Sequence, residues 1–199
     1  MSIVNIYTTD NILGRSIQYY FCSIVDNILT SDSEDLIEFG PEPDCEIILI
    51  NLISSPLSPL KIINFINTKY SKEPDPTIVV FVDSRDILIC RNIITNKKTI
   101  VMGFNASLSR YAEVLSGMHS PSFEDIKKDN KLTRKELDIL GLLLDGHRIN
   151  EISTSLQSSS KTIYNHRKNT IKKLNFKNTM ELTQSIVRLN AYSTNGIQS

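Results

Sequence analysis

The sequence has no tryptophan, only three cysteines and no long apolar run. No apolar stretch approaches the roughly 20 residues that a membrane-spanning helix needs. Cys22, Cys45 and Cys90 are an odd number without a CxxC spacing, which argues against a disulfide framework and a cysteine metal site. The first ten residues lack the basic and apolar regions of a secretory signal. We therefore expect a cytoplasmic protein without a membrane segment.

The common motifs of catalytic and cofactor sites are also missing. The chain contains no GxGxxG, P-loop, GxSxG or HExxH pattern. Its three histidines, His119, His147 and His166, have no cysteine or carboxylate partners at metal-ligand spacing. The sequence therefore predicts a protein that is not an enzyme, with no catalytic residue, metal site, cofactor or small-molecule ligand.

A net charge of zero conceals an uneven distribution of charge along the chain. Residues 127–190 hold 13 lysines and arginines against six acidic residues, whereas residues 1–126 hold nine against 16. A basic C-terminal third is suited to a polyanion, and the acidic remainder is not. This asymmetry predicts two parts with different tasks.

The first part of the chain alternates short β-branched runs with longer segments. We predict strands at 3–7, 46–53, 77–82 and 99–104 and a weaker one at 35–39, with helices at 12–29, 57–70, 86–95 and 107–118. Continuous apolar strands are typical of a parallel sheet covered by helices on both faces. Residues 1–118 are thus predicted to form a doubly wound α/β domain of about five strands.

A polar linker at 119–131 precedes a region with helical periodicity at 132–190, and residues 191–199 form an uncharged tail. Thr133 and Glu136 have the spacing of a capping box, and Gly146 stands where that first helix would stop. Three more helices follow at short intervals, so we predict a compact all-α domain of four helices.

The third of these helices, predicted at 161–174, has two different faces. Ile163, His166, Thr170 and Leu174 follow helical spacing and are predicted to face inward. The opposite face is basic and polar. A helix of this width fits the major groove of B-DNA, where lysine and arginine neutralise phosphates and asparagine pairs with adenine. A merely solvated charged face is the alternative.

The C-terminal pattern resembles the LuxR-type helix-turn-helix domain, also called the GerE or NarL type. The resemblance covers about 131–190 and rests on several spaced positions: Leu132, Thr133, Glu136, Leu140, Gly146, Glu151, Ile152, Lys161, Thr162, Ile163, His166, Lys173 and Leu174. Ser158 and Thr170 depart from it, since the family usually has apolar residues there.

This resemblance implies a role in DNA binding for residues between Ile149 and Lys172. The helix-turn-helix itself would run from Ile149 to Lys168. The residues expected to contact DNA are Lys161, Thr162, Tyr164, Asn165, Arg167, Lys168 and Lys172. The residues expected on the dimerisation helix are Glu181, Leu182, Ser185, Ile186 and Leu189.

Domains of this type often follow a response-regulator receiver, and the predicted α/β domain resembles that flavodoxin-like fold. Receivers carry an acidic pair after the first strand, a phosphate-accepting Asp at the end of the third and a Lys after the fifth. Here those places hold Thr9 and Asp10, Asn51, and Asn105. An amide is not a nucleophile for acyl-phosphate formation, and one carboxylate makes a poor Mg²⁺ site. We therefore expect a degenerate receiver without a phosphoryl switch; an unrelated α/β domain is the alternative.

The combination is similar to the RcsA-type auxiliary regulators of enterobacteria. This resemblance implies a bacterial transcription regulator of the activator type that is cytoplasmic and associated with the nucleoid. Such a regulator would bind double-stranded DNA together with a second copy of itself or with a response regulator of the RcsB type. Its implied targets are capsule, motility or surface-structure genes, and RNA polymerase is a further candidate partner. The main alternative is an interaction module that sequesters another regulator without specific DNA contact. A quorum regulator fits poorly, because the N-terminal region is short and lacks tryptophan.

Overall fold

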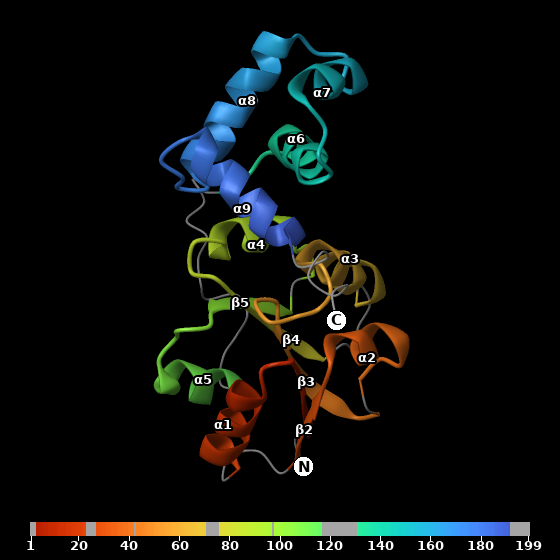
Figure 1. Cartoon of the computed structure of the whole chain (residues 1–199), viewed down its shortest axis with the longest axis vertical. Helices are drawn as coiled ribbons and strands as arrows, with labels where there is room; N and C mark the ends of the chain where they lie inside the picture. Colours follow the sequence, from red (N-terminus) through yellow and green to blue (C-terminus); the bar gives the residue numbers. More distant parts are fainter. Residues whose placement is uncertain are drawn as a thin grey trace, which may run out of the picture.

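The computed structural model describes residues 3–22, 27–41, 43–70, 76–96, 98–116 and 131–191. The predicted linker lies outside these ranges except for Lys131, and the predicted tail lies outside them except for Ala191. The described residues form an α/β part followed by a group of helices (Figure 1). This is the predicted fold class.

Five parallel strands form one sheet in the order β2-β1-β3-β4-β5. Helices separate consecutive strands, so the topology is doubly wound. The strands are β1 (Ile3–Tyr7), β2 (Asn27–Ser31), β3 (Cys45–Asn51), β4 (Thr77–Val82) and β5 (Thr99–Gly103). The central strands β3 and β4 are buried along nearly their whole length, as their continuous apolar runs predict.

The sheet carries a separate apolar core on each face. One core is formed with α1 (Asn11–Phe21) and α5 (Leu108–Leu115) and includes Ile17, Phe81 and Tyr111. The other is formed with α2 (Ser33–Glu38), α3 (Pro59–Lys69) and α4 (Ile87–Ile93). Both faces are therefore covered, which makes the alternation of strand and helix stable.

Two predicted elements near the start of the chain were wrong. The predicted helix at 12–29 ends at Phe21, and Asn27–Ser31 is an edge strand paired with β1. The predicted strand at 35–39 lies within and just beyond helix α2, whose Asp32 and Asp35 form a capping box. The edge strand is largely exposed, so it lacks the buried apolar run that identified the other strands.

The C-terminal part consists of four helices joined by short turns. They are α6 (Arg134–Leu144), α7 (Ile149–Ser155), α8 (Ser160–Lys173) and α9 (Thr179–Ala191). Thr133 and Glu136 form the predicted capping box, and Gly146 takes a positive φ of 85° just beyond α6. Helices α6, α7 and α9 all contact α8.

Helix α9 also packs against the α/β part, where it contacts α3 (Figure 1). The apolar core on that side of the sheet continues into the C-terminal helices through Leu140, Leu182 and Leu189. Helix α4 contacts α6 as well. The two parts of the chain therefore share one apolar cluster, and α9 lies at their junction.

Candidate nucleic-acid interface

Helix α8 has one face held in the protein and one face open to solvent. Ile163 is fully buried and packs with Ile139 of α6 and Ile152 of α7. Thr170 and Leu174 are also buried, whereas His166 is only half-buried. The inward stripe predicted from the sequence is therefore present, with His166 at its edge.

The residues predicted to bind DNA occupy the other face of α8. Tyr164 is 51% exposed, and its ring stacks under the guanidinium of Arg167, 4.8 Å from the ring centroid to Cζ. Arg167 is half-buried. The remaining predicted residues are all exposed: Lys161, Thr162, Asn165, Lys168 and Lys172. The structure thus places the predicted DNA-binding residues along one accessible surface, which we call the α8 face.

Capping and an ion pair fix both ends of α8. Ser159 is the N-cap, and its hydroxyl accepts a hydrogen bond from the Thr162 amide. Near the other end, Lys173 Nζ lies 2.7 Å from Glu136 Oε2 on α6. Burial would raise the pKa of Glu136, but hydrogen bonds from Lys173 and Thr133 outweigh it and lower that pKa. The basic surface therefore stands on a rigid support.

One of the two departures from the family pattern leaves a buried polar group. The Thr170 side chain is 1% exposed, and its hydroxyl has no hydrogen-bond partner among the described residues. Ser158 is only half-buried, and its hydroxyl donates to the Leu156 carbonyl. An unpaired buried hydroxyl lowers stability, but neither departure disturbs the arrangement of the helix.

The residues predicted for dimerisation face their own chain for the most part. Leu182, Ser185 and Leu189 are buried, while Glu181 and Ile186 are half-buried. The face of α9 that is open to solvent is instead formed by Met180, Thr183, Gln184 and Val187. Dimerisation through α9 stays a prediction, and in this arrangement the chain itself covers most of the surface predicted for it.

A buried carboxylate of the α/β part binds this inner side of α9, beside the apolar cluster that holds Leu182 and Leu189. Asp86, which precedes α4 and is 3% exposed, accepts hydrogen bonds from the Ser185 hydroxyl and from Nε and Nη2 of Arg188. The guanidinium bonds measure 3.0 and 2.8 Å, and the contact with Asp86 raises the pKa of Arg188. Sequence reasoning missed this contact. Its partners stand about 100 positions apart, so no local pattern could indicate it.

The receiver-like positions at the end of β3 form a neutral hydrogen-bond network. Asn51 is buried, and its Nδ2 donates to the hydroxyls of Thr8 at 3.2 Å and Ser54 at 2.8 Å. The Thr9 hydroxyl donates to the Ser54 carbonyl. Asp10, the one carboxylate, is exposed and caps α1 by accepting from the amides of residues 12 and 13. Ser54 was not predicted, since serine alone gives no signal.

The fourth receiver-like position, Asn105, also makes a neutral contact. It follows β5, and its Oδ1 accepts a 2.8 Å hydrogen bond from the Ser84 hydroxyl. No group of three or more His, Cys, Asp or Glu side chains suited to a metal ion occurs in the described part of the chain. Nor does any described helix have the length and apolar character needed to span a membrane.

The chain was compared with protein families and with known proteins. Residues 130–186 match the model of the bacterial regulatory proteins of the luxR family. The chain is 43% identical over 61 residues to the response regulatory protein YgeK of Escherichia coli K12, a match that covers 31% of this chain and 42% of that protein. The match thus spans less than half of that relative's length.

The fold of nearly the whole chain is similar to solved structures of RcsB. RcsB from Salmonella enterica serovar Typhimurium bound to promoter rprA aligns with a TM-score of 0.62 and 19% identity, over 96% of this chain and all of that one. Another RcsB–DNA complex aligns with a TM-score of 0.57 and 22% identity, over 94% and 98%. Residues 130–186 thus match the luxR family of bacterial regulatory proteins, and the described α/β part and C-terminal helices together have a fold similar to that of the RcsB structures.

Proposed function

We propose that the chain is a DNA-binding transcription regulator that reads a duplex with the α8 face. The observation that carries the proposal is the division of α8 into a buried apolar side and an exposed side bearing lysine, asparagine and tyrosine. A helix presented in this way enters the major groove, while the preceding helix α7 crosses the backbone. The similar RcsB structures, which are complexes with DNA, support the proposal.

We assign different roles to residues along this face. Tyr164, Asn165 and Lys168 lie together on the exposed side and have the chemistry to contact base edges. Lys161, Arg167 and Lys172 would hold phosphates, and Thr162 lies beside them in the first turn. Phosphate contacts position the helix, and base contacts give sequence preference.

Replacing Asn165 with alanine tests the readout role. The change is expected to weaken binding to a preferred duplex by about 1–3 kcal/mol and to reduce discrimination, because one bidentate contact is lost. Lys172→Ala is the matched control on the same face: it should weaken preferred and random duplexes alike and reduce the salt slope by about one unit. Fluorescence anisotropy over a salt series measures both. Equal losses on all duplexes for both variants would contradict the assignment.

We further propose that the receiver-like domain works without phosphorylation. The acceptor position is an asparagine whose amide is engaged by two hydroxyls, and Asp10 is used as a helix cap. Incubation with acetyl phosphate and Mg²⁺ should leave the intact mass unchanged. A stable adduct of one phosphoryl group, measured by mass spectrometry, would contradict this proposal.

The domain would then act as an association surface. A single helix-turn-helix reads one half-site, and useful specificity normally needs two. The partner we propose is a second copy of the chain or a response regulator of the RcsB type, with the chain acting as its auxiliary on surface-structure, capsule or motility genes. The contacts of α9 with the α/β part would have to rearrange if its inner face pairs with that partner.

A further inference from the structure

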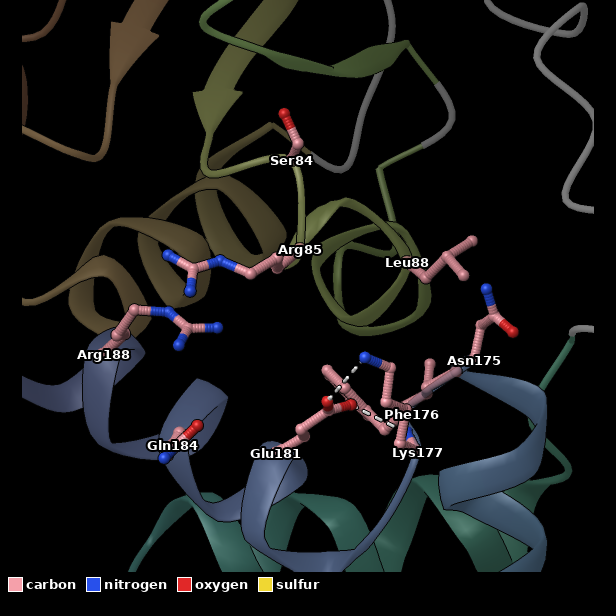
Figure 2. A pocket seen from close by; sticks show the side chains of 10 residues that line it. Ser84, Arg85, Leu88, Asn175, Phe176, Lys177, Glu181, Gln184 and Arg188 are labelled. Atoms are coloured by element: carbon pink, nitrogen blue, oxygen red, sulfur yellow. Dashed lines mark hydrogen bonds and ion pairs between the residues drawn. The ribbon is translucent and has the colours of Figure 1, made fainter.

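A pocket lies between the α/β part and the C-terminal helices. Its volume is about 380 Å³, which falls within the range of small-molecule sites. One wall is the turn before α4, with Ser84 and Arg85, and the start of α4, with Leu88. The other wall is the α8–α9 turn, with Phe176, and α9, with Arg188 (Figure 2). The pocket is thus built from both domains.

The charged side chains that line this pocket are mostly basic. Arg85, Lys177 and Arg188 line it, against Glu181 as the one acidic residue among the lining side chains. Lys177 lies 3.9 Å from Glu181, and each arginine lies 2.8 Å from a carboxylate, Asp83 for Arg85 and Asp86 for Arg188. The charges in and around the pocket are therefore balanced, and the two arginines offer a ligand hydrogen-bond donors from opposite walls.

Both arginines are held in place from behind by carboxylates. Arg85 binds Asp83 through Nε and Nη2 at 2.9 and 2.8 Å, and Arg188 binds Asp86 through the same two atoms. The Nη1 group of each has no hydrogen-bond partner among the described residues. In Figure 2 the two guanidinium groups approach the same part of the pocket from opposite walls. A ligand there meets donors that are already oriented.

We propose that this pocket binds a phosphorylated small molecule of about nucleotide size. A phosphate is tetrahedral and can accept hydrogen bonds from two walls at once, whereas a planar carboxylate is best matched by a single guanidinium fork. Phe176 and Leu88 supply an apolar area beside the arginines, where an aromatic or aliphatic portion of the ligand packs. The volume exceeds what a lone phosphate fills.

Such a ligand would join the two domains. Arg85 belongs to the α/β part and Arg188 to α9, so an anion between them strengthens the packing of α9 against the α/β part, where α9 contacts α3. The sequence predicted no small-molecule ligand, because the two arginines are far apart in the chain. The site gives the receiver-like domain an input that needs no phosphoryl transfer.

Isothermal titration of the full chain with ADP and with pyrophosphate tests the site. We expect one ADP per chain, and Arg85→Gln should weaken binding roughly tenfold or more, because it removes a charge-assisted hydrogen bond. Adenosine lacks the phosphates, so its affinity for the unmodified chain should be no higher than the affinity of ADP for Arg85→Gln. Pyrophosphate should compete with ADP, which identifies the phosphates as the anchoring group.

Lys135→Gln is the matched control, since it removes one positive charge from an exposed position of α6 that neither lines the pocket nor belongs to the α8 face. It should bind ADP as the unmodified chain does. The proposal is overturned if neither ADP nor pyrophosphate shows saturable binding, if Arg85→Gln binds ADP unchanged, or if Lys135→Gln loses as much as Arg85→Gln. No DNA is present in these titrations, so their failure leaves the proposed DNA-binding function to its own test.

Discussion

Replacing Asp86 with alanine should lower the free energy of unfolding by about 3 kcal/mol and free α9 from the α/β part. The carboxylate is buried and neutralises the Arg188 guanidinium, which is itself 27% exposed. Removing one partner of a buried ion pair leaves the other charge uncompensated, at a cost of about 3–5 kcal/mol. The partial exposure of Arg188 places the expected loss at the lower end of that range. Urea denaturation followed by circular dichroism measures it.

Asp83→Ala is the matched control for this prediction. Asp83 lies three residues earlier and pairs with Arg85, whose side chain is 67% exposed. Hydrogen bonds from Arg85 lower the pKa of Asp83 to about 2, but an exposed pair contributes at most about 1 kcal/mol. If the two alanine variants lose the same stability, the buried contact does not hold the domains together.

The Asp86→Ala variant also tests whether the contact of α9 with the α/β part limits self-association. In the unmodified chain, Ser185 and Leu189 are buried in the junction between the two parts. Releasing them exposes the surface that the sequence predicted for dimerisation. Sedimentation velocity should therefore show more dimer for Asp86→Ala than for Asp83→Ala. A monomeric Asp86→Ala variant would contradict a role of the inner α9 face in pairing.

Replacing Ile163 with alanine should have a comparably large effect, confined to the C-terminal helices. Ile163 is fully buried against Ile139 and Ile152, and the cavity left by such a truncation costs about 2–5 kcal/mol. Tyr164→Ala, one position further along, removes a half-exposed side chain and should change stability by less than about 1 kcal/mol. Urea denaturation monitors both variants.

The pair of variants separates folding from recognition. Ile163→Ala should lose DNA affinity because α8 is no longer held in place, and it should also lose stability. Tyr164→Ala should lose affinity while keeping its stability, since its ring and the stacked Arg167 lie on the exposed side of α8. Unchanged DNA affinity in a folded Tyr164→Ala variant would remove Tyr164 from the interface.

Local signals predicted most of the fold, and the places where they failed have a physical cause. The strand Thr77–Val82 was predicted to the residue because a buried parallel strand has a continuous apolar sequence, and Ile3–Tyr7 was predicted to the residue from its short β-branched run. The edge strand β2 was missed because its pairing with β1, rather than its own exposed residues, determines its conformation. In α2 the capping box overrides a short apolar run that favoured a strand.

The candidate site also has a part that local sequence signals predicted and a part that they did not. The α8 face could be predicted because helical periodicity alone separates Ile163 from Asn165 and Lys168. The contact of Asp86 with α9 and the pocket beside it could not, since they depend on how two domains pack. The sequence predicted that acidic groups are missing around Asn51. It did not predict the hydrogen bond from Asn51 to the Ser54 hydroxyl.

The central claim is that α8 reads a DNA sequence, and selection from a pool of random duplexes tests it most directly. The full chain, alone or with a response regulator of the RcsB type, should enrich a defined sequence. A folded variant with alanine at Tyr164, Asn165 and Lys168 should enrich none. Enrichment of the same sequence by that variant, or no enrichment by the unmodified chain under either condition, would contradict the account.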